Sequence, residues 1–567
     1  MKKSKLSKAA LLLLTGALVL SACGGNNSDS SNTGNSSGTG STQTDENKPI
    51  TFTFFGADAS PNWNNMKDDV GQEIIKRTGV TLNAEYDVNG GGDEKIPLMI
   101  ASGDLPDLIF PKGNLSKLVD AGVMIDMTDL IEEHAPNLKK LYGSNMNRLK
   151  YSNEDQAIYA IPTNGSVDHQ VFDATGGFEI QHRVLKELGY PEVRTLEDYE
   201  NVLRAYVEKH PTTDGLPTIP LTLNADDWKI MITVTNPAFL ATGAPDDGEF
   251  YIDPETYEAK LHYKRPVEKE YFRWLNKMYN DGLLDKDTFV QKDDQYKSKI
   301  ASGRVLGLID QEWNYGEAEN ALKAANKHEY TYAHFSVTLN EDIEDRSLQA
   351  TGFDGYGLGI TTSCEDPVRA IKFLDWMASE EGQVLRNWGI EGKHYVVEDG
   401  VRVIPEDIKD RKRNDNSAFT KESGIGLYYV ISGHYGDGVK DSTGNYYTTN
   451  FPEEIVANYS DVEKETLAAY GATTWKDLFP GEDAYPVKEW GAAYNMPVPS
   501  DTDYSVIYQK TQDIIRKRIP EAIISKPDQF DAVYDGMLAE LDKAGAVKME
   551  EEYTGYVKDR VKLWTGQ

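Results

Sequence analysis

The sequence contains very little cysteine and a marked shortage of basic residues. Only Cys23 and Cys364 occur among 567 residues, and Cys23 lies in an N-terminal export pattern, so no pair or cluster remains for a disulfide framework or a thiolate metal site. Lys and Arg number 59 against 92 Asp and Glu, a formal net charge of −33. Binding to nucleic-acid phosphates takes clustered Lys and Arg. These shortages therefore exclude a disulfide scaffold, a zinc–thiolate protein and a nucleic-acid-binding protein.

A long hydrophobic run is also missing, even at the N-terminus. The apolar stretch from Ala9 to Leu20 is interrupted only by Thr15 and Gly16 and follows a lysine-rich start. About a dozen apolar residues cannot cross roughly 30 Å of hydrocarbon, which takes about 20, so a secretory signal is favoured over a transmembrane anchor. The sequence Leu-Ser-Ala-Cys ending at Cys23 resembles the bacterial lipobox. We predict a signal peptide over residues 1–22 and a lipid on Cys23.

The segment that follows Cys23, up to residue 48, has nothing to bury. It consists almost entirely of Gly, Ser, Asn, Thr and Asp, a composition typical of a disordered linker. Residues 34–38 match the hydrolase pattern G-x-S-x-G, but that pattern needs a strand before it and a helix after it. We therefore predict a body held by a flexible tether outside a bacterial cell membrane.

Alternating strand and helix patterns begin at residue 50. The runs 50–55, 80–86 and 107–110 predict buried strands. Between the first two, Trp63, Met66, Val70 and Ile74 follow the spacing of an amphipathic helix, and a second helical stretch lies around 96–101. This order is typical of an α/β protein with a mostly parallel sheet, in which ligands lie beyond the carboxyl ends of the strands.

The same rhythm returns further along the chain. Helices are predicted near 183–189, from 195 with a Thr195–Asp198 capping box, and near 266–280. Residues 303–309 predict a strand, the Tyr- and Gly-rich stretch 392–496 predicts an insertion of loops and short strands, and the terminal stripe from Phe530 to Leu541 predicts a helix.

Several segments together resemble the extracellular solute-binding proteins of bacterial oligosaccharide ABC transporters, in the large lipoprotein branch that includes alginate-binding proteins. The segments are Ala101-Ser102-Gly103-Asp104-Leu105-Pro106-Asp107, Tyr159-Ala160-Ile161-Pro162, Leu196-Glu197-Asp198-Tyr199, Asn280-Asp281-Gly282-Leu283-Leu284-Asp285 and the run from Leu374 to Tyr395. The resemblance implies two α/β lobes joined by crossing segments, with a sugar held in the cleft between them. It also implies a monomer without a cofactor that delivers its ligand to two permease subunits served by a separate ATPase.

The resemblance suggests a division of the chain and two departures from the family pattern. The N-terminal lobe is expected over 49–162 plus about 305–360, and the C-terminal lobe over 163–304 plus about 361–567. Relatives carry an acidic calcium loop where this chain has residues 210–217, with Asp214 as its one carboxylate, so no metal is expected there. The segment Ile180-Gln181-His182-Arg183 also differs from the Arg and Trp common in relatives, so the sugar is expected to differ.

Ligand-binding candidates are aromatic platforms and polar side chains, because a sugar offers CH-rich faces and hydroxyl edges. Trp63, Trp228 and Trp313 stand in polar loop settings, and Trp388 precedes a glycine. Each of them has the alternative role of packing in the core, which is favoured for Trp274 and Trp376.

The polar candidates come mainly from the segments that resemble the family's lobe crossings. Asn164, Asp354 and Tyr356 belong to these segments, although Asn and Asp beside glycine commonly bond their own backbone. Arg183 is expected to pair with a carboxylate, either of a sugar or of the protein.

The predicted function is capture of an extracellular oligosaccharide for import, without enzymatic activity. The alternatives are a surface-tethered glycosidase or lyase, for which 92 acidic residues always offer some carboxylate pair, and an adhesin. No H-E-x-x-H and no G-x-G-x-x-G occurs.

Overall fold

The computed structural model describes residues 48–88, 92, 94–163, 165–481, 485–500 and 502–566. The predicted signal peptide, Cys23, nearly all of the predicted linker and Asn164 lie outside these residues. Glu46–Gln567 forms one compact unit. Within the described residues no helix combines the length and apolar character that a membrane crossing requires.

The first sheet has five strands in the order β2-β1-β3-β13-β4. Its strands are β1 (Ile50–Gly56), β2 (Val80–Tyr86), β3 (Leu108–Phe110), β4 (Ile161–Pro162) and β13 (Gly357–Ile360). β1 runs parallel to β2 and β3, whereas β13 is antiparallel to β3 and β4. Phe54 and Phe55 are both buried, on opposite faces of β1, because helices cover both sides of the sheet.

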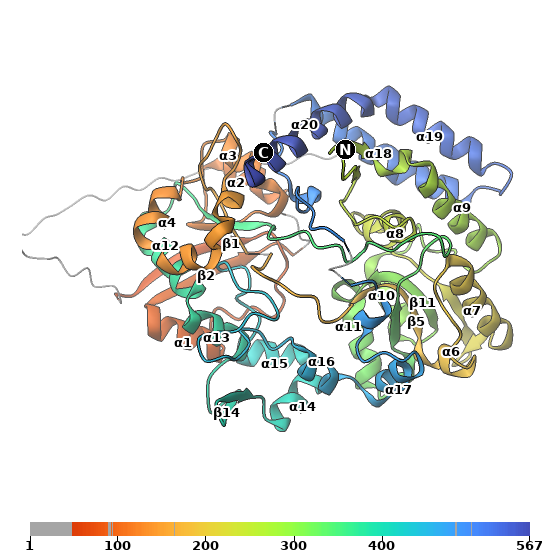
Figure 1. Ribbon diagram of the computed structural model, residues 1–567, viewed down its shortest axis with the longest axis horizontal. Helices are drawn as coiled ribbons and strands as arrows, with labels where there is room; N and C mark the ends of the chain where they lie inside the picture. The colour runs from red at the N-terminus through yellow and green to blue at the C-terminus, as the bar shows by residue number, and fades with distance from the viewer. Residues whose placement is uncertain are drawn as a thin grey trace, which may run out of the picture. The chain divides into compact units, whose positions relative to one another are not determined.

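The helices beside this sheet come from two distant stretches of chain (Figure 1). They are α1 (Asp69–Thr78), α2 (Lys95–Ser102), η1 (Lys112–Asn114), α3 (Leu115–Asp120), α4 (Thr128–His134), α5 (Pro136–Tyr142), η2 (Gly143–Leu149), α12 (Pro367–Ala378) and α13 (Glu380–Trp388). Leu374 and Leu138 belong to the same core cluster, and the Asp375 carboxylate accepts from the Leu138 backbone N at 2.9 Å. The helices α12 and α13 therefore complete the core of the first sheet, although they lie far from its first strands in the sequence.

The second sheet has four strands in the order β12-β5-β11-β8. Its strands are β5 (Gly176–Gln181), β8 (Ile219–Leu221), β11 (Val305–Gln311) and β12 (Tyr332–Phe335). β11 is parallel to β8, and β5 is antiparallel to both β11 and β12. The prediction of a mostly parallel sheet is therefore wrong for this sheet, because periodicity shows that a segment is a strand but not the direction in which it pairs. The other elements of this stretch are α6 (His182–Glu187), α7 (Leu196–Lys209), β6 (Thr212–Thr213), β7 (Leu216–Pro217), η3 (Met231–Thr235), α8 (Pro237–Ala241), β9 (Phe250–Ile252), β10 (Ala259–Leu261), η4 (His262–Lys264), α9 (Pro266–Asn280), α10 (Asp293–Ala301), α11 (Glu312–Ala324) and η5 (His328–Tyr330).

Two crossing segments join the sheets, and three long helices complete the chain. Residues 163–175 lead from β4 to β5, and residues 336–356 lead from β12 to β13. The helices α18 (Asp503–Ile524), α19 (Phe530–Ala544) and α20 (Ala546–Thr565) gather beside α9 (Figure 1). The predicted stripe is confirmed, since Phe530, Met537 and Leu541 are fully buried.

The predicted division of the chain into lobes differs from the observed strand pairing. Residues 305–360 were assigned to the N-terminal lobe, but β11 and β12 pair with β5, and only β13 returns to the first sheet. Likewise α12 and α13 pack in the core of the first sheet although they lie beyond residue 360. A strand pattern shows that a segment is a strand, but the hydrogen-bonding partner is chosen by the tertiary structure.

Two local predictions also need correction. The helix predicted from Trp63 begins only at Asp69, because the Asp68 carboxylate caps it by accepting from Gly71 N at 2.7 Å and Met66 has φ 57°. The stretch 392–496 contains helices as well as short strands. Its elements are β14 (Val396–Glu398), β15 (Val401–Val403), α14 (Glu406–Asn414), α15 (Asn416–Ser423), α16 (Pro452–Asn458), α17 (Asp461–Ala469), η6 (Trp475–Leu478) and η8 (Ala493–Asn495).

Candidate functional site

Two of the predicted tryptophans lie together beyond the carboxyl ends of β8 and β11. Trp313 comes two residues after β11, and Trp228 lies in the loop that follows β8. Their rings are stacked, with centroids 6.0 Å apart and planes 15° apart. Trp313 is 62% exposed. The pair therefore presents a flat apolar surface to solvent, which is the surface that the CH face of a sugar ring requires.

The backbone around both tryptophans is held by ion pairs and buried polar groups. Behind Trp313, the Asp310 carboxylate is buried and accepts from Tyr296 Oη at 2.7 Å. Before Trp228, the Asp226 carboxylate accepts from Lys292 Nζ at 2.7 Å, and Asp227 has φ 52°. These contacts hold the backbone at Asp310 and Asp226, close in the chain to Trp313 and Trp228.

A carboxyl group that the sequence analysis does not select directly precedes Trp313 in the chain. Glu312 is exposed at the start of α11, where its backbone N donates to Thr175 O at 2.8 Å. Loss of hydration at the carboxyl group, and then the nearby charge of Glu319, raise the pKa of Glu312 to about 7. Its position directly before Trp313 is the signal that could have identified it. A carboxyl group in this position can accept from, or donate to, a sugar hydroxyl.

A second polar cluster lies where β1 and β3 end and β13 begins. Lys112 Nζ donates to Asp58 Oδ1 at 2.7 Å and lies 5.9 Å from the ring centroid of Tyr356. Tyr429 is 44% exposed, and its pKa is raised to about 12 by desolvation and then by the Asp58 charge. Of this cluster only Tyr356 was predicted, and the position of Asp58 and Lys112 at carboxyl ends of parallel strands is the signal that could have found them.

Helix α18 spans between the two clusters. Its Arg516 donates to Asp227 Oδ1 at 2.8 Å, next to Trp228. Its Tyr508 has a pKa well above the ordinary value, because of burial first and the nearby charges of Glu249, Tyr553 and Tyr356. One helix therefore borders the paired tryptophans and the Tyr356 cluster.

Four other predicted residues have structural partners. Trp63 packs its ring 5.6 Å from those of Tyr86 and Tyr428, and Trp388 is buried with Nε1 donating to Tyr446 O at 3.0 Å. The buried Trp388 takes the packing role that is its alternative, whereas Trp63 is half-buried and stays a candidate for ligand contact.

Arg183 and Asp354 are likewise bound to the protein. Arg183 donates to Gly303 O at 3.0 Å and stacks 4.2 Å from the Tyr330 centroid. Asp354 accepts from Ala492 N at 2.7 Å and pairs with Arg560 at 3.3 Å. Their partners satisfy them within the protein, and no role in ligand contact is needed to explain their positions.

The loop at the position of the family's calcium site is a tight hairpin. Asp214 and Gly215 connect β6 to β7 with φ values of 50° and 80°, and the Asp214 carboxylate pairs with Lys327 Nζ at 3.0 Å. Across the described residues no group of three or more His, Cys, Asp or Glu side chains is arranged to hold a metal ion.

The fold is that of a class of extracellular binding proteins. The profile of the family described as bacterial extracellular solute-binding protein matches residues 70–387, and the chain belongs to that family. Lipoprotein LipO of Bacillus subtilis (strain 168) is 24% identical over 369 residues, 63% of this chain and 68% of that protein.

A second relative is similar in both sequence and structure. The fructooligosaccharide ABC transporter substrate-binding protein FusA of Streptococcus pneumoniae is 28% identical over 321 residues, 53% of this chain and 56% of that protein. The structure of FusA with kestose has a TM-score of 0.65 at 19% identity, covering 90% of this chain and 99% of FusA. Alginate-binding protein AlgQ2 has a TM-score of 0.61 at 18% identity, covering 90% and 98%. These similarities confirm the predicted two-lobed α/β fold of extracellular solute-binding proteins.

Proposed function

We propose that this protein captures an oligosaccharide outside the cell and delivers it to the permease of an ABC importer. The observation that carries the proposal is the stacked pair of the exposed Trp313 and the half-buried Trp228 at the carboxyl edge of the second sheet. The exposed Glu312, which precedes Trp313 in the chain, and Asp58 with Lys112 at the edge of the first sheet would supply hydrogen-bonding groups for hydroxyls. The family to which the chain belongs and the fructooligosaccharide-binding relative support the same function.

The N-terminal pattern extends the proposal to location and partners. A lipid on Cys23 followed by a flexible tether would hold the body at the outer face of the cell membrane. One monomer would then present its closed, loaded form to two permease subunits. The two sheets would form two lobes, joined by residues 163–175 and 336–356, that close on the ligand.

The proposal is tested by a ligand screen on the purified full chain. Neutral and acidic oligosaccharides are added, and the thermal unfolding midpoint is recorded, because a ligand at 100 times its Kd adds about 2.7 kcal/mol of stability. We expect one class of oligosaccharide to raise the midpoint and to be recovered intact by chromatography. Recovery of a shortened or unsaturated sugar would establish a carbohydrate-active enzyme instead.

Substitution of the paired tryptophans locates the site. We expect Trp313→Ala and Trp228→Ala each to weaken oligosaccharide binding about 30-fold, since a buried aromatic anchor contributes about 2 kcal/mol or more to binding. The matched control is Trp376→Ala, because Trp376 is partly exposed on α12 in the first sheet's layer. Equal affinity in the wild type and in both paired variants would contradict the proposed site.

A further inference from the structure

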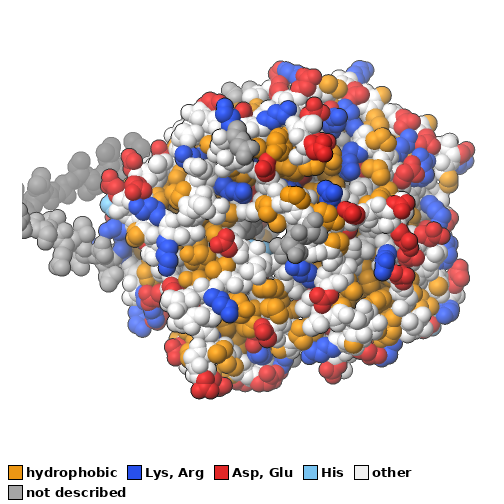
Figure 2. All heavy atoms as spheres, in the orientation of Figure 1, with side chains coloured by type: hydrophobic (Ala, Val, Ile, Leu, Met, Phe, Trp, Pro, Cys, Tyr) orange, Lys and Arg blue, Asp and Glu red, His pale blue; other side chains and the backbone are white. Residues whose placement is uncertain are grey.

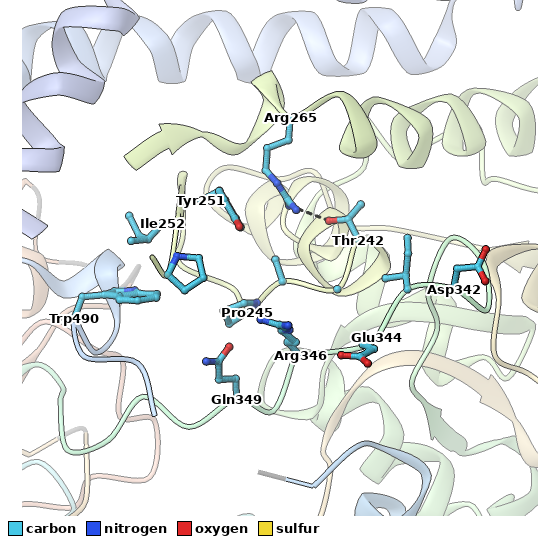
Figure 3. Close-up of a pocket in the computed structure, with 14 residues that line it drawn as sticks. Thr242, Pro245, Tyr251, Ile252, Arg265, Asp342, Glu344, Arg346, Gln349 and Trp490 are labelled. Atoms are coloured by element: carbon cyan, nitrogen blue, oxygen red, sulfur yellow. Dashed lines mark hydrogen bonds between the residues drawn. The ribbon is translucent and has the colours of Figure 1, made fainter. Parts of the chain in front are cut away.

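A cavity separate from the paired tryptophans lies beside the second crossing segment. Its volume is about 400 Å³, within the range of roughly 300–1,000 Å³ that small-molecule sites have. The walls come from the loop after α8, from β9, from residues 342–349 and from Trp490 (Figure 3). Pro245, Ile252 and Trp490 form an apolar side, and Arg346, Gln349 and Tyr251 add polar groups.

Arg346 is the unusual group in this cavity. Its side chain is half-buried, and its guanidinium stacks 4.8 Å from the Tyr485 ring centroid. Every other arginine in the described part of the chain donates to a carboxylate, carbonyl or side-chain oxygen, whereas Arg346 has no such acceptor there. The other arginines are Arg77, Arg148, Arg183, Arg194, Arg204, Arg265, Arg273, Arg304, Arg369, Arg386, Arg402, Arg411, Arg413, Arg516, Arg518 and Arg560.

A half-buried guanidinium is unfavourable unless its N–H groups donate hydrogen bonds to a ligand or to water. Its fork of N–H donors matches a carboxylate in bidentate geometry, and burial strengthens that interaction. A buried neighbour holds the backbone on which Arg346 stands, since the Asp345 carboxylate accepts from Ser347 N at 2.7 Å and from Ser336 Oγ at 2.6 Å. The guanidinium is therefore carried on a fixed turn.

The opposite wall supplies a second arginine whose charge is already compensated. Arg265 stacks 4.1 Å from the Tyr251 centroid and pairs with the fully buried Glu268. Two carboxylates, those of Asp342 and Glu344, also line the cavity, but both residues are exposed. In the close-up Asp342 stands at the edge of the view with its carboxylate directed away from Arg346, whereas the Glu344 side chain is drawn next to Arg346 (Figure 3). No ion pair joins Glu344 to Arg346 among the described residues. Arg346 is therefore the half-buried cation of this cavity that a ligand can pair with.

We propose that this cavity binds a sugar acid of the hexuronate type, with its carboxylate on Arg346. The ring would lie against Pro245, Ile252 and Trp490, and its hydroxyls would bond Gln349 and the Tyr251 hydroxyl. This combination of one uncompensated guanidinium, an apolar wall and neutral hydrogen-bonding groups fits a carboxylate carried on a hydroxylated ring better than a bare inorganic anion. The site is additional to the paired tryptophans and does not depend on the function proposed for them.

The test is calorimetric titration of the purified full chain with D-galacturonate, D-glucuronate, trigalacturonate, neutral galactose and acetate. We expect binding of a uronate but not of galactose or acetate, and a loss of about 10- to 100-fold in Arg346→Gln, because a hydrogen bond to a charged group contributes roughly 1.5–3 kcal/mol. The matched control is Arg304→Gln, since Arg304 is outside the cavity and its guanidinium donates to Pro217 O at 3.4 Å. The thermal midpoint of Arg346→Gln should change little, because this side chain donates no hydrogen bond to the described protein and the variant loses only the stacking on Tyr485.

The outcomes separate this inference from the proposed function. Binding of trigalacturonate alone, lost in Arg346→Gln, supports the cavity as a subsite for one unit of a longer chain, and binding of the free uronates supports a site for the free acid. The inference is overturned if no uronate binds, if acetate binds as well as a uronate, or if Arg346→Gln binds uronate normally. It is also overturned if Trp313→Ala, rather than Arg346→Gln, abolishes uronate binding, in which case the function proposed for the paired tryptophans still stands.

Discussion

At the scale of single residues, the structure seals one ion pair completely from water. Lys488 Nζ lies 2.7 Å from Asp247 Oδ1, with the two side chains 1% and 2% exposed, and Trp490 Nε1 donates to Asp247 Oδ2 at 3.1 Å. A buried pair adds little net stability over apolar residues, but removing one partner leaves an uncompensated buried charge.

We therefore expect Asp247→Ala to lower the free energy of unfolding by about 3–5 kcal/mol. Urea titration of the two proteins measures the difference. Asp503→Ala is the control, because the Asp503–Lys548 pair is on the surface, and it should leave the urea midpoint unchanged. Similar small effects for both variants would show that water reaches Lys488.

Buried histidines make a further residue-scale prediction about acid stability. Burial lowers the pKa of His334 to about 4, and the ring lies 5.6 Å from Trp475. An unfolded chain takes up a proton on this histidine below about pH 6.5, whereas the native protein does so only near pH 4. The free energy of unfolding therefore falls progressively between about pH 6.5 and pH 4, because His334 stays neutral in the native protein over that range.

Replacing His334 should remove its contribution to the pH dependence of the free energy of unfolding. We expect His334→Gln to lose less stability than the wild type between pH 6.5 and 4, by up to about 1.4 kcal/mol for each pH unit. Urea midpoints at several pH values measure both curves, and the acids common to the two proteins cancel in the difference. Parallel curves would mean that His334 takes up its proton at the same pH in the native protein as in the unfolded chain.

At the scale of elements, the two crossing segments touch at a glycine. A Cβ placed on Gly165 would lie 1.6 Å from Asp354 O, so any side chain there would force the segments apart. We expect Gly165→Ala to lower the thermal midpoint and to change oligosaccharide affinity, because both segments join the sheets. Gly113→Ala is the matched control, since nothing lies within 4 Å of its added Cβ. Unchanged stability and affinity in Gly165→Ala would show that the crossing segments separate freely.

At the scale of the whole molecule, α20 ties the crossing region to both parts of the chain. Arg560 on α20 pairs with Asp354 at 3.3 Å and donates to Ala492 O at 3.1 Å. Trp564 lies between Arg560 and Arg148 of η2, with each guanidinium 4.7 Å from its ring centroid. The C-terminal helix is thus linked to η2, near the first sheet, and to the segment that precedes β13.

Removing this link should loosen a defined region. We expect Arg560→Leu to speed backbone hydrogen exchange over residues 353–357 and 490–495, because several buried acceptors lose their donor. Exchange in β1, which is remote in the pairing scheme, should be unchanged. Uniformly faster exchange would indicate global destabilisation rather than a local link.

Acidic and basic groups are interspersed over the face shown in Figure 2, so this face presents no broad surface of one charge.

The sequence by itself was sufficient for everything that rests on local patterns. The α/β class, β1, β2, α9, the capping box at Thr195 and the terminal helical stripe all follow from periodicity and capping over a few neighbouring residues. Trp228 and Trp313 are candidates from sequence because a large indole in a polar setting is a local anomaly, although the structure places Trp313 in the first turn of α11.

Only the tertiary structure decided which strands pair and which candidates have internal partners. The predicted strand at 303–309 pairs in the second sheet rather than in the N-terminal lobe, because strand pairing joins residues far apart in the chain. Arg183 and Trp388 have internal acceptors, Gly303 O and Tyr446 O, that no local pattern predicts. The lack of such an acceptor at Arg346 within the described residues is likewise a property of the tertiary structure alone. Local sequence determines what a residue can donate, accept or bury, but the fold determines what stands opposite it.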